Sequence, residues 1–207
     1  MLCHTQIYPA RAMELMVQVG IFTTYDAVPA ATAETARALG RALAERKCMV
    51  LTGGSGGLMN VISEAVVKAG GLTVGIMARE AEGITEGDAW HNPYNTVRIL
   101  TGQTFTMRSA MLARSSDAAI AMAGGVGTLT EVSIAYNLGK PIIVLKGTGM
   151  MADRLTSLFP DGYIDHRKLS RMHYVGDPVE AADLAFRLGK EHEGRGDVGG
   201  RSQPMML

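Results

Sequence analysis

The sequence predicts an α/β fold in which an open, doubly wound, Rossmann-like parallel sheet of about seven strands carries helices on both faces. Short apolar runs bounded by glycine or polar turns recur along the chain, as in strands that are covered on both faces. Helix-length segments separate most of these runs, and this alternation implies right-handed crossovers between parallel strands. The 207 residues, 47% of them hydrophobic, suffice for a single domain with a substantial core.

The elements follow from these patterns in chain order. Runs with the composition of buried strands, the last of them the weakest, lie at residues 15–22, 48–52, 72–77, 96–100, 118–122, 141–145 and 172–175. Segments with the length of helices lie at residues 30–45, 58–69, 105–115, 128–138 and 178–190. One nucleotide-binding domain over residues 13–191 contains them all. Residues 1–12 lack periodicity and residues 192–207 are rich in glycine and polar groups, so we expect both termini to be flexible.

The longest irregular connection spans residues 78–95 and contains Trp90, the single tryptophan of the chain. A loop of this length is more often a lid or a binding loop than idle chain. The Trp90 indole either stacks on a ligand or packs the loop onto the body of the protein, and packing is the favoured interpretation.

The charge balance limits the classes of partner. Twenty basic and twenty acidic residues give a net charge of zero, so no global field attracts nucleic acid or a membrane surface, and any anion site must be local. No apolar stretch approaches the ~20 residues of a membrane span, and Arg11 and Glu14 interrupt the N-terminus where a secretory signal is apolar. We expect a cytoplasmic protein with no membrane partner. Neither the two cysteines nor the five histidines have a metal-ligand spacing, so no metal is expected.

Two glycine-rich turns carry the predicted chemistry, and each follows an apolar run and opens a helical segment. They are Gly53-Gly54-Ser55-Gly56-Gly57-Leu58-Met59 and Gly124-Gly125-Val126-Gly127-Thr128-Leu129-Thr130-Glu131. Glycine lets backbone amides crowd against an anion at a helix N-terminus, where free N–H groups and the helix dipole favour negative charge. Because parallel strands end at one edge of the sheet, both turns are expected there, with a phosphate-bearing ligand between them.

Neither turn is a standard nucleotide fingerprint. A P-loop requires Gly-Lys followed by Ser or Thr, whereas Gly139-Lys140 runs into Pro141, which excludes ATP hydrolysis of that type. The dinucleotide pattern requires an acidic residue about 20 positions later, where Glu80 stands beside Arg79, so NAD binding is weakly supported.

Two charged residues near these turns have both a plain and a functional interpretation. Thr128 and Glu131 have the spacing of a capping box, which satisfies helix amides, but such a box does not require the glycines that precede it. A carboxylate at Glu131 would also sit beside an anion site. Arg108 stands near a helix N-terminus, where its charge opposes the dipole, so it is either a surface residue or a phosphate ligand.

The two turns, joined by MRSAMLARSSDAAIAMA at 107–123, resemble the LONELY GUY family and its wider superfamily, which includes molybdenum-cofactor carrier proteins and DNA-processing A proteins. The resemblance covers residues 15–190 approximately. It implies a Rossmann-like fold and a homodimer with the site near the subunit interface. Some relatives carry the label lysine decarboxylase, but nothing in this sequence marks a lysine that would bind pyridoxal phosphate.

In the phosphoribohydrolase branch, the enzyme cleaves the N-glycosidic bond of a nucleoside 5′-monophosphate and releases the base and ribose 5-phosphate. The resemblance implies catalytic roles for Arg108 and Glu131 and no required cofactor. It implies nucleotide or phosphate contacts for Gly53, Gly54, Ser55, Gly56, Gly57, Met59, Gly124, Gly125, Val126, Gly127 and Thr128, with the second turn holding the phosphate.

Three residues depart from the hydrolase pattern. That pattern has lysine where this chain has Ser109, proline where it has Ala123, and an aromatic residue where it has Val126. The departures fit the carrier-like branch equally well, whose members bind a nucleotide or molybdopterin without hydrolysing it. The sequence therefore leaves two functions open, a phosphoribohydrolase and a non-catalytic nucleotide or molybdenum-cofactor carrier.

Overall fold

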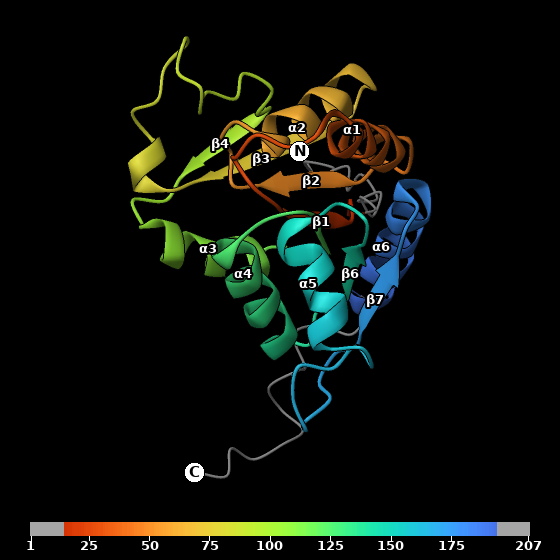
Figure 1. Ribbon diagram of the computed structural model, residues 1–207. Helices are drawn as coiled ribbons and strands as arrows, with labels where there is room; N and C mark the ends of the chain where they lie inside the picture. The colour runs from red at the N-terminus through yellow and green to blue at the C-terminus, as the bar shows by residue number, and fades with distance from the viewer. Residues whose placement is uncertain (1–14, 194–207) are drawn as a thin grey trace, which may run out of the picture.

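The computed structural model describes residues 15–193, which fold around a parallel sheet with the strand order β4-β3-β2-β1-β5-β6-β7 (Figure 1). The strands are β1 (Gln18–Phe22), β2 (Met49–Thr52), β3 (Leu72–Met77), β4 (Val97–Leu100), β5 (Ala118–Ala121), β6 (Ile142–Leu145) and β7 (Met172–Val175). The helices of this part of the chain are α1 (Ala30–Glu45), α2 (Leu58–Lys68), α3 (Phe105–Arg114), α4 (Val126–Asn137), α5 (Met150–Leu158) and α6 (Pro178–Glu193), with a 3₁₀ turn at Arg79–Ala81. The predicted fold class is confirmed.

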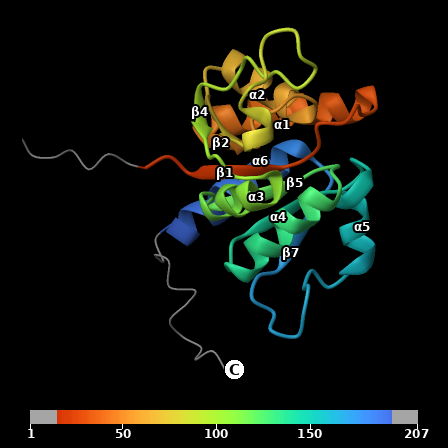
Figure 2. The ribbon, with the colours of Figure 1, turned by 90° about the vertical axis from the view of Figure 1, so that its left-hand side faces the viewer.

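The sheet separates two hydrophobic cores. On one face α1, α2 and α6 pack together over Val19 and Ile21 of β1, and on the other α3, α4 and α5 cover Phe22 and its neighbours. Figure 2 shows α3, α4 and α5 on the opposite side of β1 from α1 and α2. The chain winds outward from β1 to β4 and then returns to β5 beside β1, so the strand order reverses between β1 and β5. Ligands of open α/β sheets bind at the carboxyl ends of the strands near such a reversal.

Three of the helices differ from the sequence expectation. Helix α5 was not predicted, because it is short and opens on a turn in which Asp153 accepts hydrogen bonds from the amides of Gly147 (2.6 Å) and Gly149 (2.9 Å). Helix α4 begins at Val126, two residues before the predicted start, and α6 continues to Glu193. Of the predicted flexible segments 1–12 and 192–207, residues 192 and 193 belong to α6, and the rest lies outside the described residues. Within residues 15–193, no helix combines the length and apolar character needed to cross a membrane.

Gly40 shows how closely α1 and α2 approach each other. A Cβ at this position would lie 2.8 Å from the Cβ of Ala65 and 2.9 Å from the carbonyl oxygen of Ile62. In an exposed helix, Gly→Ala stabilises by about 1 kcal/mol. Here we expect Gly40→Ala to lower the free energy of unfolding by about 1–3 kcal/mol, because overpacking forces the two backbones apart. Urea denaturation measures the sign, and a stabilised variant would contradict the prediction.

Candidate functional site

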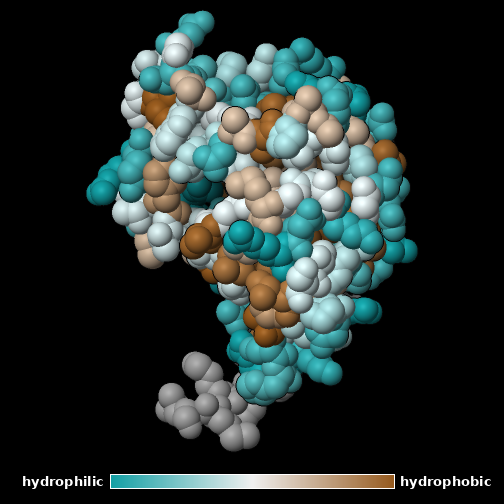
Figure 3. Space-filling model, in the orientation of Figure 1, coloured by the Kyte–Doolittle hydropathy of each residue, from teal (hydrophilic) through white to brown (hydrophobic). Residues whose placement is uncertain are grey.

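A cavity of about 310 Å³ lies at the carboxyl edge of the sheet, within the size range of about 300–1,000 Å³ that small-molecule sites have. Its walls come from the end of β1, the first glycine turn, α3 and α4. The lining residues are Ile21, Thr23, Tyr25, Gly53, Ser55, Met59, Phe105, Thr106, Arg108, Ser109, Val126, Gly127, Thr130 and Glu131. Figure 3 shows a recess in the surface on this side, between the region of α3 and α4 and the region of the loop after β3.

The glycines of the first turn make room for neighbouring protein. A Cβ on Gly53 would lie 2.6–2.9 Å from three guanidinium atoms of Arg108. Because Gly53 has no side chain, the guanidinium can pack directly against this turn. At the other glycines a Cβ would meet the sulfur of Met77 (Gly54), the carbonyl oxygen of Ala89 (Gly56) and the backbone of Tyr25 (Gly57). The first turn is therefore a packed wall, and of its predicted ligand contacts Gly53, Ser55 and Met59 line the cavity.

The second turn is open. Helix α4 has Gly125 at its N-cap with no side-chain capping hydrogen bond, and a Cβ on Gly125 or Gly127 would have nothing within 4 Å. The first amides of an α-helix have no partner within the helix. Residues 125–127 are also exposed, and these free amides together with the helix dipole make the start of α4 suited to an anion.

Thr128 has a different place from the one that the sequence predicted. Its side chain is buried, and its hydroxyl donates a hydrogen bond to the carbonyl oxygen of Thr23 at 3.2 Å. Thr128 does not line the cavity, and the same holds for Gly54, Gly56, Gly57, Gly124 and Gly125. The capping-box interpretation is wrong, because α4 begins two residues earlier and the Glu131 carboxylate contacts α3 instead of the start of its own helix.

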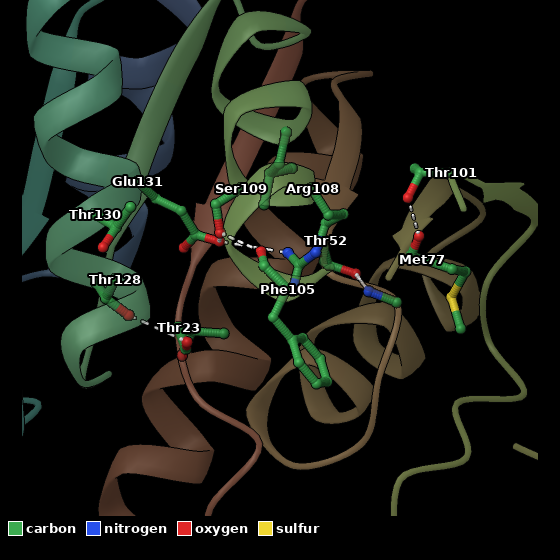
Figure 4. Close-up of polar contacts among 12 residues, drawn as sticks. Thr23, Thr52, Met77, Thr101, Phe105, Arg108, Ser109, Thr128, Thr130 and Glu131 are labelled. Carbon is green, nitrogen blue, oxygen red and sulfur yellow. Dashed lines mark hydrogen bonds and ion pairs between the residues drawn. The ribbon is translucent and has the colours of Figure 1, made fainter. Parts of the chain in front are cut away.

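Arg108 and Glu131 face each other inside the cavity, from α3 and α4 (Figure 4). Arg108 Nη1 donates to Glu131 Oε1 at 3.4 Å, and the two residues are only 7% and 5% exposed. Burial raises the pKa of Glu131 to about 7, although the Arg108 charge and a hydrogen bond from Ser109 act to lower it. Burial likewise lowers the pKa of Arg108, against the attraction of Glu131 and Glu80. For both partners, the cost of desolvating the charge exceeds the gain from pairing.

The hydrogen-bonding capacity of the cavity is incompletely used. Arg108 Nε and Thr23 Oγ1 are buried and have no partner among the described residues. A guanidinium has five N–H donors, and within residues 15–193 Arg108 uses one, in the long contact to Glu131. Buried polar groups are nearly always paired, so these two atoms mark this part of the molecule as polar and incompletely bonded.

Ser109 connects the pair to the backbone of α3. Its hydroxyl lies 3.0 Å from Glu131 Oε1 and 3.1 Å from the carbonyl oxygen of Phe105. When Glu131 is ionised, the single hydroxyl proton can be donated to the carboxylate. When Glu131 is protonated, the hydroxyl can accept from it and donate to Phe105. Ser109 was noted in the sequence as a departure from the hydrolase pattern, and the structure places it against the carboxylate.

The other departures also have structural consequences. Ala123 has φ +48°, and its amide donates to Thr148 Oγ1 at 2.9 Å. Proline is restricted to φ near −65° and has no N–H, so the proline of the hydrolase pattern cannot occupy this turn as it is folded here. Val126 is 74% exposed and lies at the mouth of the cavity.

Sequence reasoning missed part of the lining. No motif marked Ile21, Thr23, Tyr25, Phe105 or Thr106, and Thr130 stood in the second turn without an assigned role. The position of residues 21–25 at the end of a predicted strand was a usable signal, because strand ends at this edge line the ligand site in α/β sheets. Arg108 and Glu131 were both identified, and the interpretation of Arg108 as a surface residue is wrong. Within residues 15–193, no group of three or more His, Cys, Asp or Glu side chains could hold a metal ion.

Sequence comparison relates this chain to one protein family and to enzymes that resemble it. The model of the SLOG cluster4 family matches residues 16–180. The cytokinin riboside 5′-monophosphate phosphoribohydrolase of Rhodococcoides fascians is 33% identical over 164 residues, which cover 74% of this chain and 80% of that protein. The chain spans about half to two thirds of the length of the first curated relatives that it matches.

Solved structures agree with the sequence matches. The structural genomics target TM1055 has a TM-score of 0.72 at 33% identity, with 82% of this chain and 98% of that chain covered. The molybdenum cofactor carrier protein MCP from Chlamydomonas reinhardtii has a TM-score of 0.66 at 26% identity, with 84% and 98% covered. These matches confirm the resemblance that the two glycine turns indicated.

Proposed function

The chain belongs to the SLOG cluster4 family, and on that premise we propose that it hydrolyses the N-glycosidic bond of a nucleoside 5′-monophosphate. The products are the free base and ribose 5-phosphate. The observation that carries the proposal is the buried Arg108–Glu131 pair, which lines the cavity about one helical turn from the start of α4. The phosphoribohydrolase of Rhodococcoides fascians, 33% identical, supports the same reaction class.

The geometry of α4 matches the length of such a substrate. Gly127 and Glu131 are four residues apart, which is about 6 Å along an α-helix. This is comparable with the separation between the 5′-phosphate and the anomeric carbon across one ribose. With the phosphate on the amides at the start of α4, the anomeric carbon reaches Glu131, and Arg108 is within reach of the ribose hydroxyls or the phosphate.

In the proposed reaction the glycosidic C–N bond breaks and its electron pair leaves with the base, so positive charge develops on the ribose. Ionised Glu131 stabilises this charge, as carboxylates do in glycoside hydrolysis. The attacking water gives its hydroxide to the anomeric carbon, and Glu131 accepts the proton, which is then available to the departing base. Arg108 holds the substrate so that the anomeric carbon stays beside the carboxylate.

Product analysis tests the proposal. The purified protein is incubated with AMP and other nucleoside monophosphates, and free base and ribose 5-phosphate are separated by chromatography. We expect both products in equal amounts. Failure to release either product from any nucleoside monophosphate would overturn hydrolysis.

A second candidate is a non-catalytic carrier of a nucleotide or of molybdopterin. It is favoured by the similarity to the Chlamydomonas reinhardtii carrier protein and by Ala123, whose backbone excludes the proline of the hydrolase pattern. The exposed start of α4 at residues 125–127 and the Arg108 guanidinium that lines the cavity suit the phosphate of either ligand. Mass spectrometry of the denatured protein distinguishes this function, because a carrier retains intact ligand and releases no base. The homodimer is also a proposal, which size-exclusion chromatography with light scattering tests.

The proposed role of Glu131 predicts a pH profile. A carboxyl group whose pKa is raised to about 7 is protonated below that pH, so kcat/KM should fall about tenfold per pH unit on the acid side. Ser109→Ala removes a hydrogen bond that lowers the pKa of Glu131, and should move the midpoint upward by about one pH unit. Ser115→Ala, at the exposed end of the same helix, is the control. An unchanged or lower midpoint in Ser109→Ala would argue against this role.

A further inference from the structure

Three aromatic side chains gather at the edge of the cavity and have no part in the chemistry described so far. The ring of Tyr25 lies 4.8 Å from that of Trp90 at an interplanar angle of 43°, and Trp90 lies 6.0 Å from Phe105 at 72°. Tyr25 and Phe105 line the cavity, whereas Trp90 supports them from the loop of residues 78–95. We call these three rings the aromatic wall.

The packing of the first glycine turn holds this wall in place. A side chain on Gly57 would strike the backbone of Tyr25, and one on Gly56 would strike Ala89, next to Trp90. Asn95 Nδ2 donates to the carbonyl oxygen of Gly54 at 2.8 Å and so pins the far end of the loop to the same turn. Trp90 therefore packs onto the body of the protein, as expected, but the surface that it packs against is itself a wall of the site.

The aromatic wall adds a planar apolar surface that the polar part of the cavity does not have. The start of α4 and the Arg108–Glu131 pair suit a phosphate and a sugar, and neither offers a planar apolar surface. Tyr25 is 48% exposed at the edge of the cavity, and Figure 4 shows the Phe105 ring extending from the start of α3, below the Arg108–Glu131 contact. Aromatic rings left partly exposed in this way bind other planar rings by offset or edge-to-face stacking.

We infer that the aromatic wall binds the planar nitrogen heterocycle of the ligand and makes the protein selective for ligands that carry one over the bare sugar phosphate. This inference rests on the proposed function for the assignment of the heterocycle as a nucleotide base. Tyr25 and Phe105 contact the ring directly, and Trp90 is a positioning residue that acts through them. A pterin presents the same chemistry, and the experiment separates the two sources.

The test compares AMP with ribose 5-phosphate by isothermal titration calorimetry, in a Glu131→Gln background so that substrate is not consumed. Phe105→Ala should weaken AMP binding about 10-fold or more, because stacking on one aromatic side chain contributes about 1–3 kcal/mol per base. Its affinity for ribose 5-phosphate should change less than twofold. Phe159→Leu, at the end of α5 on the other side of α4, is the control for a lost aromatic ring. Equal loss for both ligands, no loss for AMP, or no AMP binding before substitution would overturn the inference.

The single tryptophan gives an independent signal. Because Trp90 packs against Tyr25 and Phe105, AMP should change its fluorescence, whereas ribose 5-phosphate at saturation should not. Trp90→Leu should weaken AMP binding without changing ribose 5-phosphate affinity, and Trp90→Phe should largely restore it. A phosphorylated pterin that binds more tightly than AMP would assign the heterocycle to the carrier function. Whether AMP is hydrolysed is read separately from product release, so failure of the proposed reaction leaves this comparison interpretable.

Discussion

Glu131→Gln is expected to lower kcat for AMP hydrolysis by about 100- to 1,000-fold, the usual effect of removing one group that stabilises transition-state charge. Glutamine keeps the volume of the side chain and can still accept the hydrogen bond from Ser109, which lies 3.0 Å from Oε1. It cannot supply the negative charge that the ribose needs as the glycosidic bond breaks. AMP affinity should stay within a few-fold, because the proposed phosphate site is at the start of α4.

The control for this substitution is Glu180→Gln, an exposed glutamate in the first turn of α6. It should leave kcat unchanged. Thermal unfolding of Glu131→Gln is measured in parallel, since the change leaves the Arg108 guanidinium buried without an ionic partner. A folded Glu131→Gln protein with the activity of the wild type would remove the carboxylate from the mechanism.

Gly53→Ala is expected to reduce kcat/KM about 100-fold without unfolding the protein. The added Cβ would lie 2.6 Å from Nη1, 2.8 Å from Nη2 and 2.9 Å from Cζ of Arg108, so the guanidinium must move. The backbone of Gly53 does not have a positive φ, and the obstructed atoms end a flexible side chain, so the cost in stability is small. A shift of about 1 Å in a positioning group is enough to lower a rate by two orders of magnitude.

A double-mutant cycle decides whether Gly53 acts through Arg108. In an Arg108→Ala background, Gly53→Ala should have little further effect, because the group that it displaces is already absent. Gly83→Ala is the matched control, since a Cβ there has nothing within 4 Å and the glycine has no positive φ. Additive losses in the double variant would show that Gly53 has a role independent of Arg108.

The two glycine turns illustrate how far composition can be interpreted. Both were predicted as anion-binding turns because both place glycines between a strand and a helix. The structure distinguishes the two turns. The space where a Gly53 side chain would stand is occupied by Arg108, whereas that space is empty at Gly125 and Gly127. Composition gives the same prediction for a glycine that admits a ligand and for one that admits a neighbouring side chain.

The Arg108–Glu131 pair shows the same limit. Arg108 and Glu131 were identified as candidates by their places in the motifs, but Ser109 was noted only as a missing lysine. Its contact with Glu131 joins residues 22 positions apart on two helices. The aromatic wall joins three separate segments and corresponds to no motif, so no local pattern could have indicated it.

By itself, the sequence determined the alternation of strands and helices, the parallel sheet and the edge at which both glycine turns lie. These follow from local periodicity and from the fixed handedness of crossovers. Only the tertiary structure decided which turn is open, that burial raises the pKa of Glu131 to about 7, and that Tyr25, Trp90 and Phe105 meet at one cavity. Those properties depend on desolvation and on contacts between segments distant in the chain, which a local pattern does not contain.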